Sequence, residues 1–204
     1  MAGTDNLYIQ KFHESKIERF GSDNARSLAW HDRKGQLRRF DILTLAGNFN
    51  NSSVLDIGCG NGDLCAYLSQ RYVGFSYVGI DLISSFLDNA IELNKNYTAA
   101  RFCKGDFMKA ELPLVDYVLL SGSLNYKRAD PEFIFKAISK LFNQSKIALG
   151  FNLLSEIKNP DGILTAYSPQ QIVDYCQTLS PHIIFKDNYA GYDYTVIMYK
   201  SPLI

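Results

Sequence analysis

The residues best suited to chemistry lie in one glycine-rich loop, within the stretch VLDIGCGNGDL at residues 54–64. Gly58, Gly60 and Gly62 alternate there directly after a short apolar run, and this spacing lets a ligand lie against a bare backbone. A helical pattern follows, and the first N–H groups of a helix are free to bind a polar ligand. The loop therefore predicts a cofactor of nucleotide type, although a tight turn without a ligand would use the same glycines.

Two further signals stand at the ends of the next apolar runs. Asp81 ends the second run, about 20 residues after the glycines, where an acidic residue can accept the ribose hydroxyls of a nucleotide. Asp106 and Phe107 follow the third run, where a polar and aromatic pocket could hold a purine. Because ligands of open α/β sheets bind at the carboxyl ends of the strands, the three signals predict a single site.

Position 63 indicates which nucleotide is favoured. A dinucleotide fingerprint reads G-x-G-x-x-G and needs a third glycine there, whereas this chain has Asp63. A carboxylate is stable at a helix N-terminus but repels a pyrophosphate. We also expect no second domain, which a dehydrogenase would need to hold its substrate. A nucleoside without phosphate is therefore favoured over NAD.

The elements that must position these residues alternate between strands and helices after Ser52, which is typical of a mostly parallel sheet with helices on both faces. The last two strands are separated only by YAGY, which is too short for a crossover helix, so they should pair antiparallel. The predicted strands are 53–57, 76–82, a short one within 100–107, 115–121, 146–154, 182–188 and 193–200.

Helical periodicity marks the segments before and between these strands. Residues 1–50 are predicted to form an N-terminal helical cap of the same domain as residues 51–204. Its second helix should turn Leu37, Phe40, Leu43 and Leu45, or positions near them, inward and end at Gly47. Further helices are predicted at 64–72, 84–96, 131–142 with Asp130 as its cap, and after a capping box at Ser168 with Pro169 in the first turn.

Composition is that of an ordinary soluble globular protein with one domain. Hydrophobic residues make up 47% of the chain, and the formal net charge is zero, so no global charge directs it to nucleic acid or anionic membrane. No signal-peptide pattern is present, and no stretch approaches the ~18 apolar residues of a membrane span. We expect a cytoplasmic protein that binds no membrane.

Two groups of residues have alternative interpretations. The four cysteines form no CxxC pair, so we expect buried free thiols and no metal site. The run DRKGQLRR is locally basic, and it is either a solvated helix face or an anion-binding edge. The residues concerned are Cys59, Cys65, Cys103 and Cys176, and Arg33, Lys34, Arg38 and Arg39.

Taken together, VLDIGCGNGDL, YVGIDL, CKGDF and DYVLLSGSLNY resemble the successive motifs of class I S-adenosylmethionine-dependent methyltransferases. The resemblance covers roughly residues 50–200. It implies a doubly wound α/β fold with a seven-stranded, mostly parallel sheet of order 3-2-1-4-5-7-6, whose last strand is antiparallel. It also implies S-adenosyl-L-methionine as the cofactor.

The resemblance further implies which residues bind that cofactor. Its methionine and ribose parts should lie on the glycine loop, its ribose hydroxyls on the acid after the second strand, and its adenine on the loop after the third. The matching residues are Asp56 and Ser121 at the methionine; Gly58, Cys59, Gly60 and Gly62 in the loop; Asp81 at the ribose; and Leu82, Asp106 and Phe107 at the adenine.

Methyl transfer asks little covalent chemistry of a protein, because positioning two reactants can supply about 7–11 kcal/mol. A general base would add ~10²–10⁴-fold for a hydroxyl acceptor. The candidate catalytic residues are His31, in the cap, and Tyr126, in SGSLNY after the fourth strand, although packing roles would also explain both. His13 lies in the same cap and is a further candidate base, although packing is the expected role for it and for His182. Asn125 could contact substrate.

The predicted function is transfer of a methyl group from S-adenosylmethionine to a small-molecule acceptor. SGSLNY lacks the Asn/Asp-Pro-Pro-Tyr run that is common in methyltransferases acting on bases or glutamine. The alternatives are an RNA or protein methyltransferase that uses the basic run, and a non-catalytic S-adenosylmethionine-binding module. The sequence identifies neither the acceptor atom nor the oligomeric state.

Overall fold

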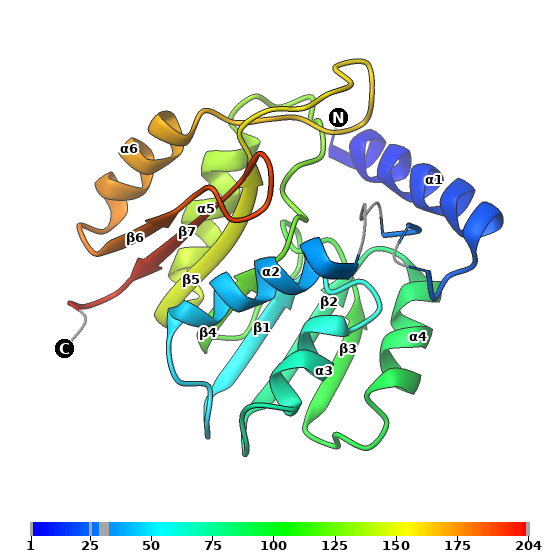
Figure 1. The fold of residues 1–204 in the computed structure, drawn as a ribbon, viewed down its shortest axis with the longest axis horizontal. Coiled ribbons are helices and arrows are strands. Elements are labelled where there is room, and N and C mark those ends of the chain that lie inside the picture. The colour runs from blue at the N-terminus through cyan, green and yellow to red at the C-terminus, as the bar shows by residue number, and fades with distance from the viewer. Residues whose placement is uncertain (1, 25, 29–32, 203–204) are drawn as a thin grey trace.

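The computed structural model describes residues 2–24, 26–28 and 33–202, which are built around one sheet (Figure 1). Its seven strands have the order β3-β2-β1-β4-β5-β7-β6, as predicted. The first five strands run parallel, and β7 runs antiparallel to both β5 and β6. The strands are β1 (Ser53–Ile57), β2 (Ser76–Asp81), β3 (Ala100–Lys104), β4 (Val115–Leu120), β5 (Ser145–Leu154), β6 (Ile183–Lys186) and β7 (Asp193–Tyr199).

Helices cover both faces of the sheet. One face packs against α2 and α3, and the other packs against α5 and α6. Helix α4 lies beside α3 and contacts β2 and β3. The helices are α1 (Ala2–Phe20), α2 (Arg33–Leu43), the 3-10 turn η1 (Thr44–Ala46), α3 (Asp63–Ser69), α4 (Ser84–Leu93), α5 (Phe133–Asn143) and α6 (Pro169–Leu179).

Successive side chains of β4 point to opposite faces of the sheet, which explains why the central strands are almost entirely apolar. Tyr117 and Leu119 belong to the cluster under α2 and α3, whereas Val118 and Leu120 belong to the cluster under α5 and α6. A strand buried on both faces needs apolar residues at successive positions. The run VDYVLL is therefore a central strand, and its carboxyl end is held rigidly for the loop that follows.

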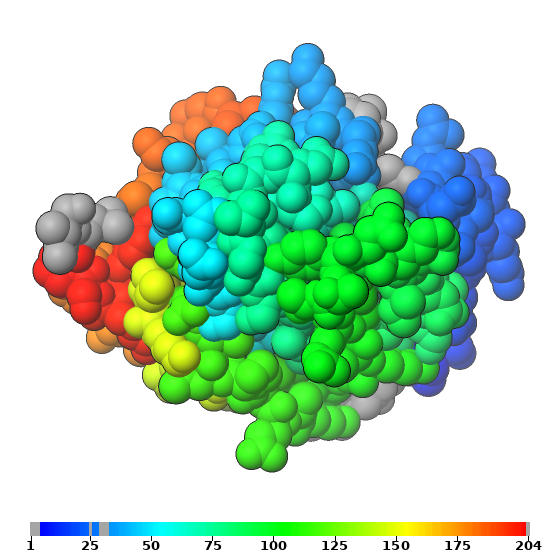
Figure 2. All heavy atoms as spheres, turned by 90° about the horizontal axis from the view of Figure 1, so that it is seen from below, coloured from blue at the N-terminus to red at the C-terminus, as the bar shows by residue number. Residues whose placement is uncertain are grey.

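Helix α1 lies across the edge of the sheet at which the parallel strands end (Figure 1). Gln10 on α1 donates a hydrogen bond to the carbonyl of Leu82, just after β2, at 3.3 Å. Figure 2 shows the molecule from below that view, where the cyan and green parts of the chain cover most of the surface and α1, in blue, lies at one side. No helix among the described residues is long and apolar enough to cross a membrane.

Several local predictions are wrong. Helix α5 begins at Phe133 with Glu132 as its N-cap, because Asp130 instead accepts the Glu132 N–H at 3.0 Å in a turn before the helix. Ser168 is the N-cap of α6, as predicted, but its side chain makes no capping hydrogen bond. The inward position predicted at or near Leu45 is Ala46, because the tighter period of η1 buries Ala46 and leaves Leu45 46% exposed.

Three cysteines are buried free thiols, as predicted, whereas Cys103 is exposed. Cys103 lies on β3, which is the strand at one end of the sheet. An edge strand has one neighbour only, so part of its surface remains open to solvent.

Candidate functional site

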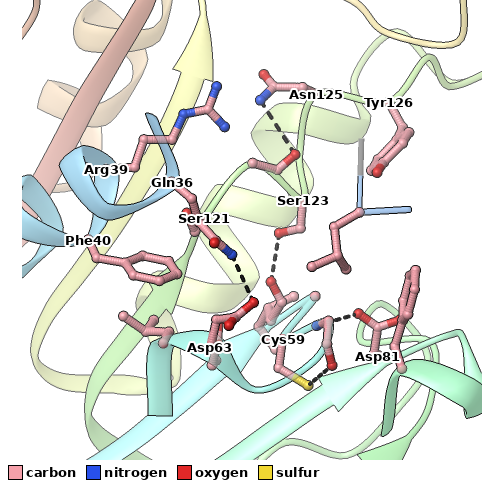
Figure 3. A pocket seen from close by; sticks show the side chains of 18 of the residues that line it. Gln36, Arg39, Phe40, Cys59, Asp63, Asp81, Ser121, Ser123, Asn125 and Tyr126 are labelled. Atoms are coloured by element: carbon pink, nitrogen blue, oxygen red, sulfur yellow. Dashed lines mark hydrogen bonds between the residues drawn. The ribbon is translucent and has the colours of Figure 1, made fainter. Parts of the chain in front are cut away.

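A cavity of about 600 Å³ opens at the carboxyl ends of the parallel strands (Figure 3). Its floor is formed by residues that directly follow β1, β2, β3 and β4. Helices α1 and α2 and the loop between β6 and β7 contribute the remaining walls. The predicted loop signals therefore meet in one place, as expected for an open α/β sheet.

The glycine loop needs glycine because of both its backbone and its neighbours. Gly58 and Gly60 have φ angles of +73° and +52°. A Cβ atom at Gly58 would lie 2.4 Å from Cβ of Ser123, and one at Gly60 would lie 2.6 Å from Cδ2 of Leu28. The N–H groups of Gly58 and Cys59 donate to the carbonyl of Ile80 at 2.7 and 3.1 Å, which ties the loop to β2.

Gly62, predicted to bind the cofactor together with Gly58 and Gly60, is also constrained by the packing of α3. It has a φ of +73° at the N-cap of α3, and a Cβ there would lie 2.9 Å from Cβ of Ala90 on α4. It is not among the described residues that line the cavity. Its bare backbone lets α3 and α4 approach each other, so it supports the loop from behind.

Asp81 ends β2 with its carboxylate in the cavity. One oxygen accepts the N–H of Gly60 and the other accepts the N–H of Ile83, both at 2.9 Å. Burial raises the pKa of Asp81, while these hydrogen bonds act in the opposite direction. Each oxygen keeps a further lone pair, so a carboxylate in this position can accept two ligand hydroxyls.

Asp56, within β1, also borders the cavity and is only 2% exposed. The hydroxyl of Tyr77 donates to its carboxylate. Burial raises the pKa of Asp56 to about 7, and the charges of Asp81 and Asp63 contribute in the same direction. A cation bound beside this carboxyl would favour its ionised form.

Asp63, which the sequence suggested would repel a pyrophosphate, has a charged partner in the structure. Arg33, at the start of α2, forms an ion pair with this carboxylate. Gln36, one turn further, donates from Nε2 to its second oxygen at 3.0 Å, and Figure 3 shows the two side chains pointing toward each other. The repulsion that Asp63 exerts on an anionic ligand is therefore reduced.

The loop after β4 supplies polar atoms of two kinds. Ser123 donates to the carbonyl of Ile57 at 2.6 Å, and Asn125 accepts the N–H of Leu154 at 3.0 Å, so both are occupied in holding neighbouring strands. The hydroxyl of Ser121 borders the cavity, is buried, and has no hydrogen-bond partner among the described residues. A buried hydroxyl without a protein partner can accept a hydrogen bond from, or donate one to, a ligand or a water molecule in the cavity.

The loop after β3 only partly matches its predicted role. Gly105 and Phe107 line the cavity, and Leu82 lies opposite them after β2. Asp106 is not among the described lining residues, because it accepts hydrogen bonds from Nδ2 of Asn6 at 2.9 Å and from the N–H of Met108 at 3.0 Å. Its carboxylate helps to fix α1 over the site.

Tyr126 lies on the cavity wall and is hydrogen-bonded to His13 of α1, with 2.7 Å between Oη and Nε2. His13, expected to be a packing residue, therefore reaches the site. His31, the other candidate catalytic residue, lies outside the described residues. No group of three His, Cys, Asp or Glu side chains in the described part of the chain is placed to hold a metal ion.

The basic run lies at the rim of the cavity. Arg39 binds both carboxylate oxygens of Asp193, through Nε at 2.6 Å and through Nη2. Lys34 and Arg38 also line the cavity but are exposed, and Arg38 donates to the carbonyl of Tyr189 at 3.3 Å. Half of the predicted basic face is therefore used in ion pairs that join α2 to other elements.

Sequence reasoning missed Gln36, Arg128 and Asp193 as cavity residues. Gln36 could have been found, because it lies on the same helical stripe as Phe40 and Leu43, where a polar residue is unexpected. Arg128 and Asp193 lie in or next to loops, where no periodic pattern indicates direction.

Comparisons with known proteins agree with this architecture. Residues 54–145, from β1 to the start of β5, match the family model of a methyltransferase domain. No curated protein sequence matches the chain significantly.

Solved structures share the fold at low identity. Magnesium protoporphyrin IX methyltransferase (ChlM) from Synechocystis PCC 6803, with bound SAH, has a TM-score of 0.72 at 14% identity, over 98% of this chain and 100% of that one. The N-methyltransferase NodS from Bradyrhizobium japonicum WM9 has a TM-score of 0.70 at 14% sequence identity, over 93% of this chain and 97% of that one. The [4+2]-cyclase SpnF gives 0.63 at 14%, over 81% of each.

Such low identity establishes the fold and not the reaction. The family match covers the strands and loops that build the floor of the cavity. Residues 54–145 are thus similar to a methyltransferase domain, and the chain shares the Rossmann-like, seven-stranded fold of solved methyltransferases.

Proposed function

We propose that this protein is an enzyme that transfers a methyl group from S-adenosylmethionine to a small-molecule acceptor held in the cavity. The observation that carries the proposal is the convergence of the glycine loop and the Asp81 carboxylate on one cavity at the carboxyl edge of the sheet.

The residues present fit this cofactor. The buried Ser121 hydroxyl needs a partner, the loop at Gly58 and Gly60 leaves no room for a Cβ atom, and Asp81 can accept two hydroxyls. When bound, the cofactor supplies an electrophilic methyl group on a positively charged sulfur. The residues proposed to hold it are Asp56, Gly58, Cys59, Gly60, Asp81, Leu82, Phe107 and Ser121, all of which line the cavity.

The other walls of the cavity support a small acceptor. They carry apolar and aromatic side chains, and a volume of about 600 Å³ is typical of small-molecule sites. The chain would act mainly by positioning the acceptor and excluding water. The RNA and protein alternatives lose support, because Arg33 and Arg39 of the basic run already pair with Asp63 and Asp193.

Replacement of Asp81 tests the cofactor site. We expect Asp81→Ala to fold and to bind S-adenosylmethionine and S-adenosylhomocysteine at least about 10-fold more weakly, because a charge-assisted hydrogen bond of ~1.5–3 kcal/mol is lost. Asp88→Ala is the matched control, since Asp88 is exposed on the adjacent helix α4. Equal dissociation constants for the two variants in titration calorimetry would refute the role of Asp81.

A further inference from the structure

Two residues from distant parts of the chain form a buried pair in the cavity wall. His13 on α1 and Tyr126 after β4 are 113 positions apart, and Nε2 lies 2.7 Å from the phenolic oxygen. Nδ1 of the same ring lies 2.7 Å from the carbonyl of Ser27. His13 is 5% exposed, yet it borders the cavity together with Tyr126. Both ring nitrogens are therefore fixed by named partners.

These partners determine where the protons are. The carbonyl of Ser27 can only accept, so Nδ1 carries the hydrogen of the neutral ring. Nε2 is then an acceptor, and Tyr126 donates its hydroxyl proton to it. The remaining lone pairs of the Tyr126 oxygen can only accept. A ligand at this position must therefore bring a proton, which a hydroxyl, amine or thiol does and a carboxylate does not.

Burial keeps the pair neutral before reaction. Burial lowers the pKa of His13, the hydrogen bond to the Ser27 carbonyl and the charge of Asp81 oppose this, and Lys16 on α1 acts in the same direction as burial. Burial and Asp81 raise the pKa of Tyr126, against Arg128 and Arg39. The rings of Phe12 and Phe86 pack against the imidazole, with centroids 5.2 and 5.4 Å away. The imidazole is thus free to take up a proton.

We propose that the acceptor reacts through a hydroxyl group, and that His13, acting through Tyr126, takes the proton that this hydroxyl loses on methylation. This inference rests on the proposed function. Tyr126 touches the acceptor and is a catalytic residue, whereas His13 acts through it as a positioning residue that also holds the proton.

The step balances in atoms and charge. The acceptor oxygen bonds to the methyl carbon, and the carbon–sulfur bond breaks with its electron pair left on sulfur. The acceptor proton passes to the oxygen of Tyr126, while the proton of Tyr126 passes to Nε2 of His13. The products are a methyl ether, a neutral thioether, a neutral phenol and an imidazolium. One positive charge has moved from sulfur to His13, and the negative charge of Asp81 stabilises the resulting imidazolium.

S-adenosylmethionine and S-adenosylhomocysteine differ by this charge and the methyl group, so their relative affinity reports on His13 without any acceptor. A positive charge near His13 lowers its pKa more than a neutral thioether does, so protonation of His13 should weaken S-adenosylmethionine more. Titration calorimetry of the full chain measures the dissociation constant of S-adenosylmethionine divided by that of S-adenosylhomocysteine. This ratio should rise at least about threefold as the pH falls from about 7 to about 5.

Variants separate His13 from the other groups that titrate in this range, notably Asp56. In His13→Gln the part of the rise that is due to His13 should vanish. His182→Gln is the control, because His182 is not among the described residues that line the cavity. Within the described chain, its hydrogen bonds use its own backbone N–H and carbonyl rather than its imidazole ring. In Tyr126→Phe the rise should move to higher pH, since the neutral imidazole loses a hydrogen-bond donor. This variant keeps the test decisive even if His13→Gln does not fold.

The outcomes distinguish this inference from the proposed function. If neither nucleoside binds the wild-type protein, the proposed function fails. If both bind and their ratio follows the same pH dependence in the wild type and His13→Gln, the inference is overturned while the cofactor site stands. If His13→Gln does not fold and Tyr126→Phe follows the wild-type curve, the inference is overturned as well.

Discussion

At the scale of single residues, four aspartates line one cavity, and the three on or after β1 and β2 are each held by different partners. Asp63 is paired with Arg33, Asp81 is bound by two backbone N–H groups, and Asp56 has a tyrosine hydroxyl. A buried carboxylate without a cation costs folding free energy when it is ionised. Asp56 is the least compensated of the three, which fits a position where a cationic ligand group binds.

This cost leads to a pH-dependent prediction for stability. The folded protein holds the Asp56 proton up to a pKa of about 7, whereas the unfolded chain releases it near the ordinary value. The contribution of Asp56 to stability is therefore complete below about pH 4 and is lost as the pH rises toward 7. We expect Asp56→Asn to raise the free energy of unfolding at pH 8 by about 2–4 kcal/mol, and not at pH 4.

Urea unfolding at the two pH values measures this effect. Asp88→Asn on the exposed side of α4 is the control and should change little at either pH. A difference between Asp56→Asn and wild type that is the same at both pH values would show that Asp56 titrates normally.

At the scale of elements, α2 joins the two ends of the cavity. Arg33, the first residue of α2, forms an ion pair with Asp63 at the start of α3. Arg39, later in the same helix, forms one with Asp193 at the start of β7. Arg39 and Asp193 are 13% and 6% exposed, so this pair is largely removed from solvent. Removing one partner of such a pair leaves an uncompensated charge, which costs more than the pair itself contributes.

We therefore expect Arg39→Met to lower the free energy of unfolding by about 3 kcal/mol. Arg38→Met is the matched control on the adjacent, exposed position of α2, where we expect less than about 1 kcal/mol. Denaturant midpoints at constant slope compare the two variants. Equal losses would mean that the Arg39–Asp193 pair does not stabilise the fold.

The predictable part of the structure is the part with a regular pattern. Short apolar runs that alternate with helical segments placed the strands to within a few residues, and the signal was clearest for central strands such as β1 and β4, which are buried on both faces. The loops at Gly58, Asp81 and Phe107 were found for the same reason, since each directly follows a strand.

Contacts between distant elements left no such signal. The position of His13 depends on how α1 crosses the sheet, and the partners of Asp63 and Asp193 depend on how α2 docks. The hydrogen bond from Asn6 of α1 to Asp106 likewise depends on where α1 docks. Local sequence does not encode these packing choices, so they could only be seen in the assembled fold.

At the scale of the whole molecule, the fold closes a cavity between the rigid sheet and helix α1. Asn6 connects the two sides, because it donates to Asp106 and accepts from Nη1 of Arg128 at 2.6 Å. The strands fix the floor, while α1, α2 and the β6–β7 loop surround the space above it. This arrangement suits one nucleoside on the floor and a second small molecule beside it.

The central claim is that the floor binds S-adenosylmethionine, and a thermal unfolding scan with three ligands tests it most directly. At about 100 times its dissociation constant, a ligand adds ~2.7 kcal/mol, which raises the midpoint by roughly 5–10 °C for a chain of this size. We predict this shift with S-adenosylmethionine and with S-adenosylhomocysteine, and none with NAD. A shift with NAD alone, or no shift with any of the three, would contradict the account.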